Sequence, residues 1–410
     1  MNSSTEYWIW LSCGLNAGFN ANPLLNFYKT PQKVYEMDKQ QWVISGMLTP
    51  KAAERLSNFT LDEAKRILAQ CQNKGWSVIT PDSEHYPPLL RSIRAYPLVL
   101  FVNGDASHLA HPLPIAFVGT REASQSGLLL AESYASSLSK AGALIVSGGA
   151  LGIDSAAHMG ALQAGFPTIA FLGCGFNSGY LQSNRSLREA ISRHGACVSE
   201  FPPDTPASRA TFPIRNRLIA GMSQGTVVVE AGLRSGSLIT ARNAIESGRD
   251  VFAFPGELTS SIHAGTNKLL KEGAHFVTSR RSIMGVYESS YPELVNMEAI
   301  DADDLAELPQ QSYVTPTKKK TTKNPTKTIN REQAVPKTSP KASPKPTFDT
   351  SLLSDDTAKK VYDTLSEEPM TVDEIALATG LDAGDILIAL TDIEVCGGLI
   401  PCPNKKYKKE

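Results

Sequence analysis

The chain has 410 residues, of which 41% are hydrophobic and 20% charged, and its formal net charge is −1. This length is too great for one hydrophobic core, so the composition predicts a globular protein of two or three domains. The near-zero net charge excludes a global positive field, and any nucleic-acid partner must be held by local clusters of positive charge. The sequence contains no apolar run long enough to predict a membrane span.

The cysteines and the first residues of the chain indicate the cellular compartment of the protein. The six cysteines form no CxxC pair and no metal-ligand spacing, which predicts reduced thiols and no metal site. Residues 1–16 contain no basic residue and only a short apolar patch, so this segment does not resemble a signal peptide. We therefore expect a cytoplasmic protein. The cysteines are Cys13, Cys71, Cys174, Cys197, Cys396 and Cys402.

The amino-terminal part is predicted to be a small helical domain followed by a connector. Residues 1–80 are typical of short helices, as in SAM or helix-hairpin-helix modules, and Thr60 with Glu63 predicts a capped helix start. Residues 81–113 form a proline-rich connector around one strand-like run, 98–102.

Residues 114–285 repeat one pattern: a run of β-formers that ends abruptly in Gly, Ser, Arg or Asn. Helix-like segments separate the runs, which predicts a parallel, Rossmann-like sheet in an extended α/β fold with helices on both faces. The strand-to-helix turns of such a sheet open on one edge, where ligands bind. Glycines and helix N-termini at that edge predict a polar groove suited to phosphate. The runs are 114–118, 143–146, 168–172, 226–229 and 251–254.

The last third of the chain is predicted to contain a linker and a small domain. Residues 286–350 are first acidic and then basic, with few apolar side chains, which predicts a disordered linker. Residues 351–410 alternate helical segments, one of them starting at Thr371, with a terminal strand pair, as in a winged helix. Its expected recognition helix, 383–395, is acidic, so a protein contact is favoured over duplex DNA as its ligand.

Three common phosphate-binding sites can be compared with the sequence. The chain lacks the GxxxxGK[ST] pattern of P-loop ATPases and the GxGxxG pattern of dinucleotide sites, so neither ATP nor NAD is expected as a cofactor. The turn Glu230-Ala231-Gly232 leaves a third alternative open. Nucleotide or nucleoside-phosphate hydrolases of the lysine-decarboxylase-like class place a glutamate in such a turn, although their PGGxGTxxE pattern is absent.

The glycine-rich turns resemble one family more closely. The motifs Phe117-Val118-Gly119-Thr120-Arg121, Ser147-Gly148-Gly149-Ala150-x-Gly152-Ile153-Asp154, Phe212-Pro213-x-Arg215-Asn216-Arg217 and Ser235-Gly236-Ser237-Leu238-Ile239-Thr240-Ala241 occur in this order. They resemble the DNA-processing protein A (DprA, also called Smf) family, and the resemblance covers residues 115–275.

This resemblance implies a function. It implies a single-stranded DNA-binding protein that is not an enzyme and needs no cofactor. Members protect incoming DNA during natural transformation and load the RecA recombinase onto strands covered by single-strand-binding protein. They form homodimers through the far edge of the Rossmann-like domain.

The resemblance and the turn pattern together predict the DNA-binding residues. In the family, a basic residue three positions before the Phe-Pro pair contacts phosphate and the Phe stacks on bases, which corresponds to Arg209 and Phe212. Arg215 and Arg217 are expected at a helix start, one facing the groove and the other paired with Glu200 or Glu230. The predicted DNA-binding set is Gly119, Arg121, Ser124, Ser147, Gly148, Gly149, Gly173, Gly175, Asn177, Arg209, Phe212, Arg215, Asn216 and Arg217.

Other polar residues are predicted to order the site. Asp154 should cap a helix that opens at Ser155, His158 should pack or hydrogen-bond a turn, and Glu230 should order the Arg-Asn-Arg segment. Ser235 and Gly236 belong to this ordering set because their turn lacks the GxSxG pattern of a nucleophile.

The chain departs from the family pattern at two places. Leu151 replaces a family arginine, and Tyr180-Leu181 replaces Tyr-Pro. We therefore expect a weaker site, or one that relies more on Arg121, Arg209 and the basic linker.

Overall fold

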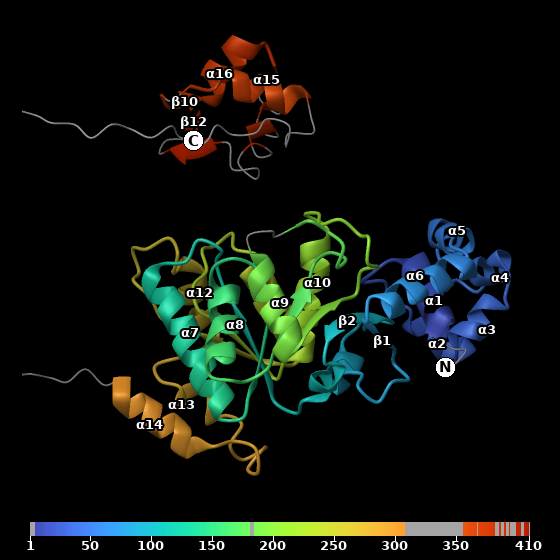
Figure 1. The fold of residues 1–410 in the computed structure, drawn as a ribbon, viewed down its shortest axis with the longest axis horizontal. Helices are drawn as coiled ribbons and strands as arrows, with labels where there is room; N and C mark the ends of the chain where they lie inside the picture. Colours follow the sequence, from blue (N-terminus) through green and yellow to red (C-terminus); the bar gives the residue numbers. More distant parts are fainter. Residues whose placement is uncertain are drawn as a thin grey trace, which may run out of the picture. The chain divides into compact units, whose positions relative to one another are not determined.

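The computed structural model divides the chain into two compact units, Met1–Val314 and Thr315–Glu410 (Figure 1). It describes residues 5–180, 184–307, 356–366 and 368–381. It also describes 385–386, 389–390, 393, 399–402 and 406–409. Within these residues, no helix is long and apolar enough to cross a membrane.

The described part of the first unit contains a nine-stranded sheet with the order β1-β2-β6-β5-β4-β3-β7-β8-β9. The strands β6, β5, β4, β3, β7, β8 and β9 run parallel to one another, as predicted. At the other edge, β1 pairs antiparallel with β2, and β2 pairs antiparallel with β6. The strands are β1 (Ser77–Ile79), β2 (Leu100–Gly104), β3 (Pro114–Val118), β4 (Leu144–Ser147), β5 (Thr168–Leu172), β6 (Ala196–Ser199), β7 (Gly225–Val228), β8 (Asp250–Ala253) and β9 (His275–Phe276).

The antiparallel edge corrects two predicted boundaries. The segment 1–80 was expected to be helical, but its last residues form β1. The strand-like run predicted at 98–102 is confirmed as β2, which belongs to the sheet and not to a separate connector. The connector also contains two short 3-10 helices, Pro88–Ser92 and Ala106–Ala110. The reason is long-range pairing: β2 covers the edge of β6, and a local sequence pattern does not show which distant strand a segment pairs with.

Helices cover both faces of the sheet, as expected for α/β architecture (Figure 1). Alternate residues of β3 enter opposite cores: Phe117 packs with the first helix set and Val118 with the second. The first set is α7 (Gln125–Lys140), α8 (Ile153–Gln163) and α9 (Arg185–His194). The second set is α10 (Thr211–Met222), α11 (Ser237–Glu246) and α12 (Ala264–Lys271).

The strand order reverses between β3 and β7. From β3, successive strands add on one side as β4, β5 and β6, whereas β7, β8 and β9 add on the other side. Helix α10 makes the crossover from β6 to β7. In doubly wound sheets such a switch point separates adjacent strand-to-helix turns and opens a crevice for ligand.

Six helices form the amino-terminal domain around a separate apolar core that includes Trp10 and Leu56 and extends to Phe101 of β2. The predicted cap of α6 is confirmed: Thr60 Oγ1 accepts from Glu63 N, and Glu63 Oε2 accepts from Thr60 N at 2.7 Å. The helices of this described segment are α1 (Thr5–Leu15), α2 (Asn22–Tyr28), α3 (Pro31–Tyr35), α4 (Lys39–Ile44), α5 (Pro50–Asn58) and α6 (Leu61–Asn73).

The predicted start of the disordered linker (286–350) is too early in the sequence. Residues 286–307 pack on the body through α14 (Met297–Glu307), which follows α13 (Arg281–Met284), and Ile300 is fully buried. Buried Arg280 donates from Nη1 to Asp304 Oδ1 at 3.1 Å. The acidic residues of this stretch therefore pair with cations of the body. Residues 308–350 of the predicted linker lie outside the described residues.

The second unit contains helices and a three-stranded antiparallel sheet in the order β10-β12-β11. Thr371 caps α16, as predicted, in a capping box with Glu374. The predicted third helix, 383–395, lies largely outside the described residues. The elements that the structure describes here are α15 (Asp356–Thr364), β10 (Met370–Thr371), α16 (Val372–Thr379), β11 (Leu399–Cys402) and β12 (Lys406–Lys409).

Candidate nucleic-acid interface

A cavity of about 630 Å³ lies at the switch point between β3 and β7. We call it the switch-point cavity. Eight predicted site residues line it: Gly119, Arg121, Asp154, Phe212, Arg215, Asn216, Ser235 and Gly236. Its wall comes from the turns after β3 and β7 and from the first half of α10, so the structure brings these residues together at the edge where a ligand was expected.

Glu230 holds the turn that carries Arg121. Its carboxylate accepts from Ser124 N at 2.9 Å and also from Ser124 Oγ, and its backbone oxygen accepts from Thr120 N at 2.8 Å. Ser124 in turn caps α7 by accepting from Gly127 N. The prediction that Glu230 orders the Arg-Asn-Arg segment is wrong. Its partners are in the β3–α7 turn, because β7 lies directly beside β3.

Arg121 and Phe212 meet at the cavity wall. The guanidinium carbon of exposed Arg121 lies 5.3 Å from the centre of the Phe212 ring, a cation–π distance. Tyr180 contacts the same ring, with centroids 5.1 Å apart. Gly173 lies beneath it, where a Cβ would come within 2.8 Å of Phe212 Cδ1. Phe212 is half-buried and lines the cavity, so a cation and an aromatic ring share this site.

Arg215 lines the same cavity but has a structural role. Arg215 was predicted at a helix start, whereas α10 begins at Thr211 and places Arg215 in its second turn, only 4% exposed. Its Nη1 donates to Gly148 O at 2.6 Å and to Phe171 O at 2.5 Å. A Cβ on Gly148 would collide with this guanidinium, so glycine is required there. Arg215 thereby ties α10 to the turn after β4.

Asp154 lies next to Arg215 and does not cap α8. The N-cap residue is Gly152, which makes no side-chain cap, and Asp154 Oδ2 accepts from Ala150 N at 3.4 Å instead. Burial raises the pKa of Asp154, and attraction to Arg215 opposes this rise. Burial likewise lowers the pKa of Arg215. The carboxylate therefore balances the buried guanidinium beside the cavity.

Arg217 forms the ion pair that the sequence suggested. Its Nη2 donates to both oxygens of Glu200 at 2.5 Å, and Glu200 Oε1 also accepts from Gly18 N at 3.2 Å. Burial raises the pKa of Glu200, and Arg217 opposes the rise. Because Gly18 belongs to the amino-terminal domain, this pair connects that domain to the body. Arg217 does not line the switch-point cavity.

Further polar residues in the cavity wall and behind it are engaged with backbone or strand partners. Ser147 Oγ donates to Phe117 O at 2.6 Å, and Asn216 Nδ2 donates to Gly236 O at 3.3 Å. His158 is fully buried, with Nδ1 2.8 Å from Thr168 Oγ1. His158 thus packs in the core, one of the two predicted alternatives, and its hydrogen bond is to a strand residue. Burial lowers its pKa to about 3.

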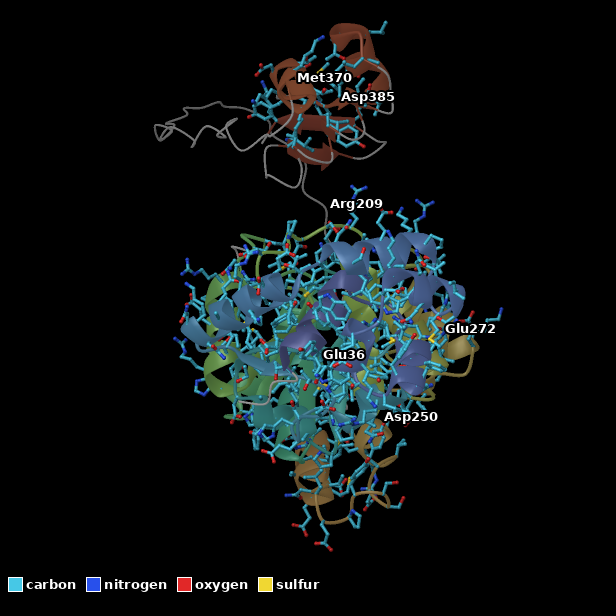
Figure 2. All side chains as sticks on the ribbon, turned by 90° about the vertical axis from the view of Figure 1, so that its right-hand side faces the viewer. Glu36, Arg209, Asp250, Glu272, Met370 and Asp385 are labelled. Atoms are coloured by element: carbon cyan, nitrogen blue, oxygen red, sulfur yellow. The ribbon has the colours of Figure 1, made fainter. Side chains whose placement is uncertain are left out.

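Other predicted DNA-binding residues lie away from the switch-point cavity. Asn177 donates to Asp204 at 2.6 Å, and Gly175 packs against the backbone of Pro202 and Pro203. Arg209 is exposed, and Figure 2 shows its side chain pointing away from the body. Ser124, Ser147, Gly148, Gly149, Gly173 and Arg217 also do not line the cavity.

The sequence analysis did not predict several residues that line the cavity. Leu233 and Arg234 follow β7, both exposed, and Ser261 and Ile262 precede α12. The signal was available for Arg234, because it comes a few residues after a strand end, as Arg121 does after β3. Placing the two arginines in one cavity required knowing that β3 and β7 are neighbours.

Fold and site together define a class: a doubly wound α/β protein with a cation- and glycine-lined cavity at its switch point, a place suited to phosphate groups. Residues 77–288 match the family described as DNA recombination-mediator protein A, and residues 337–404 match the DprA winged-helix domain. The chain therefore belongs to the DNA recombination-mediator protein A (DprA/Smf) family.

Individual relatives agree with this assignment. Protein Smf of Synechocystis sp. is 32% identical over 352 residues, covering 84% of this chain and 83% of that protein. Protein Smf of Escherichia coli is 42% identical over 240 residues, covering 58% of this chain but only 63% of that protein. The X-ray structure of DprA from Streptococcus pneumoniae superposes with a TM-score of 0.59 at 34% identity, covering 68% of this chain and 97% of that one.

Proposed function

We propose that this protein binds single-stranded DNA in the switch-point cavity and acts as a recombination mediator. The observation that carries the proposal is that exposed Arg121 and Arg234 line the same cavity as the half-buried ring of Phe212, which Arg121 contacts. Binding a single strand without strong sequence preference requires cations for phosphates and an aromatic surface for bases. The cavity supplies both.

Backbone amides supply further phosphate ligands. The turn after β3 and the turn after β7 both line the cavity and include Gly119 and Gly236, where the backbone is accessible to a phosphate. Arg209, at the exposed surface, would contact the strand outside the cavity. In this proposal the DNA lies along the carboxyl edge of the parallel strands.

The finer functions follow from family membership. We infer that the protein protects incoming DNA during natural transformation and loads RecA onto strands coated by single-strand-binding protein. It would act as a homodimer through the Rossmann-like domain, in the cytoplasm and without cofactor. These roles require no catalysis by the protein.

The competing hypothesis, a nucleotide or nucleoside-phosphate hydrolase using Glu230, receives less support. Glu230 is 2% exposed, its oxygens accept hydrogen bonds from Ser124, and it does not line the cavity. A general base must reach the proton that it abstracts. Turnover of a nucleoside monophosphate that the change Glu230→Gln abolishes would establish the hydrolase instead.

The central test is a binding titration with single- and double-stranded oligonucleotides across salt concentrations. We expect preference for the single strand, with log affinity falling by about 0.7 per phosphate contact against log salt. Equal affinity for both forms would contradict the aromatic role, and absence of binding at low salt would reject the proposal.

A further inference from the structure

A second cavity, of about 540 Å³, lies along helix α9. We call it the α9 cavity. Its lining includes three arginine side chains of α9 and part of the loop that follows β5. The residues are Asn103, Leu172, Phe176, Asn177, Ser178, Gly179, Arg185, Arg188, Glu189, Ser192, Arg193 and Cys197.

Helix α9 has a cationic face toward this cavity. Its lining positions have the spacing i, i+3, i+4, i+7 and i+8, which defines one side of a helix. That side carries Arg185, Arg188 and Arg193 against a single acid, Glu189, whose Oε1 accepts from Arg185 Nε at 2.9 Å. The opposite side packs Leu187 and Ile191 into an apolar cluster on the sheet. The charge is therefore directed into the cavity and away from the core.

The rest of the cavity wall combines polar side chains, among them Asn103 and Asn177, with an aromatic ring and two apolar residues. Phe176 lines the cavity and contacts Trp76, with ring centroids 4.9 Å apart. Leu172 and Cys197 lie at the base, and burial raises the pKa of the Cys197 thiol to about 11, so this base carries no negative charge at neutral pH. Arginines beside an aromatic ring are the same pair of groups that line the switch-point cavity.

The two cavities share one loop. The loop that follows β5 contacts Phe212 of the switch-point cavity through Gly173 and Tyr180. Between these two residues, Phe176 and Gly179 line the α9 cavity. The loop from Gly173 to Tyr180 therefore contacts the aromatic ring of the first cavity and contributes to the wall of the second.

We propose that the α9 cavity binds the phosphates of a second segment of the same single DNA strand. The inference rests on the proposed function, because the strand must first occupy the switch-point cavity. It assigns Arg188 and Arg193 to a binding surface that the turn motifs do not include. A free polyphosphate presents the same chemistry, and the experiment distinguishes the two ligands.

The test compares a short oligonucleotide of about 4 nucleotides with a long one of about 16, the range of strand lengths that single binding modules cover. Arg193→Ala and Arg188→Ala are measured in the full chain, together with Arg188→Lys. Arg242→Ala, which removes an exposed arginine from α11, serves as the control, because it loses the same charge outside the α9 cavity. Thermal unfolding verifies that each variant is folded.

The expected result depends on length. Each alanine variant should reduce the salt slope for the long oligonucleotide by about 0.7, and affinity for the short one should stay unchanged. Arg188→Lys should keep the slope, because it keeps the charge. If Arg188→Ala unfolds the protein, the measurement on Arg193→Ala alone decides, because Arg193 is exposed.

Three outcomes would overturn the inference. They are equal effects on both lengths, no effect on either, and an unchanged slope combined with tripolyphosphate binding that Arg193→Ala abolishes. Failure of the wild type to bind either oligonucleotide would instead reject the proposed function.

Discussion

Phe212 contacts two of the three arginines that line the switch-point cavity, since the guanidinium carbons of Arg121 and Arg215 lie 5.3 Å and 5.8 Å from its ring centre. These arginines differ in what they can do for a ligand. Arg121 is exposed, whereas Arg215 is buried and donates to backbone oxygens. The Phe212 ring therefore contacts one guanidinium that the fold holds in place, Arg215, and one that is exposed to a ligand, Arg121.

Replacing Phe212 with alanine should weaken single-strand binding without changing its salt dependence. Base stacking on one aromatic ring contributes about 1–3 kcal/mol, or about 5- to 150-fold in affinity. No charge is lost, so the salt slope should stay as in the wild type. Thermal unfolding and salt-dependent binding are measured on the same variant. A loss of stability of about 3–5 kcal/mol with unaltered affinity would assign Phe212 to the core instead.

Arg209 should contribute charge and little else, because it is exposed. Arg209→Ala is expected to reduce the log–log salt slope of binding by about 0.7 with unchanged thermal stability. Arg242→Ala on α11 provides a control with the same loss of charge. If both variants retain the wild-type slope, Arg209 does not contact the strand.

His158 should make stability depend on pH. Its pKa falls from the usual 6.5 to about 3 in the folded state, because burial disfavours the imidazolium. The unfolded chain therefore binds more protons between these values, and stability should decrease as pH falls through this window. This contribution amounts to about 1.4 kcal/mol per pH unit.

Denaturant unfolding of wild type and His158→Gln, between about pH 4 and pH 7, measures the effect. We expect a flatter stability curve for the variant, because glutamine does not titrate. Comparing the two proteins removes the contributions of buried carboxyls such as Asp154 and Glu200, whose raised pKa values act in the opposite direction. Parallel curves would show that His158 is not the titrating group.

At the scale of elements, α14 is held to the body by charge. Arg280 is almost fully buried between α7 and α14, and its Nη1 donates to Asp304, while Arg281 pairs with Asp301 at 2.8 Å. A buried guanidinium requires such partners, because an unpaired charge is costly in the interior. The acidic composition that predicted disorder thus stabilises a helix.

A glutamate-specific protease should distinguish the packed segment from the rest of the predicted linker. Cleavage is expected at Glu332 well before Glu298, since α14 must open before a protease can reach its backbone. Asp304→Asn should accelerate cleavage at Glu298 and cost about 1.5–3 kcal/mol of stability, the value of a hydrogen bond to a charged group. Equal cleavage at both sites in the wild type would contradict the packing of α14.

At the scale of the whole molecule, the two compact units have separate apolar cores. The first unit buries its apolar residues around the sheet and in the amino-terminal domain, and the second forms its own cluster around Val361, Ile375 and Ile386. Separate cores predict that each unit folds by itself.

A chain that ends at Val314 should therefore keep the thermal unfolding transition of the first unit. Its affinity for a short single strand should stay within about twofold near 0.15 M salt, where the Debye length of about 8 Å screens distant charges. Calorimetry and the same binding titration provide the measurement. A large loss of affinity at that salt concentration would assign part of the binding site to residues 315–410.

Local patterns in the sequence determined the elements of this protein. The β-former runs gave the strands β3, β4, β5, β7 and β8 to within a residue or two, and the caps at Thr60 and Thr371 were recognisable because their partners are three residues away. The rule that parallel strands share a carboxyl edge located the cavity. These inferences depend only on residues close together in the sequence and on a topological rule that holds for all parallel sheets.

The tertiary structure decided which of the predicted polar residues line the switch-point cavity. Arg215 contacts Gly148 across 67 residues of sequence and Glu230 contacts Ser124 across 106, and both have structural roles, Arg215 in the cavity wall and Glu230 behind it. The same long-range pairing placed β1 and β2 in the sheet and α14 on the body. The sequence alone could not assign these roles, because burial depends on which distant segments become neighbours.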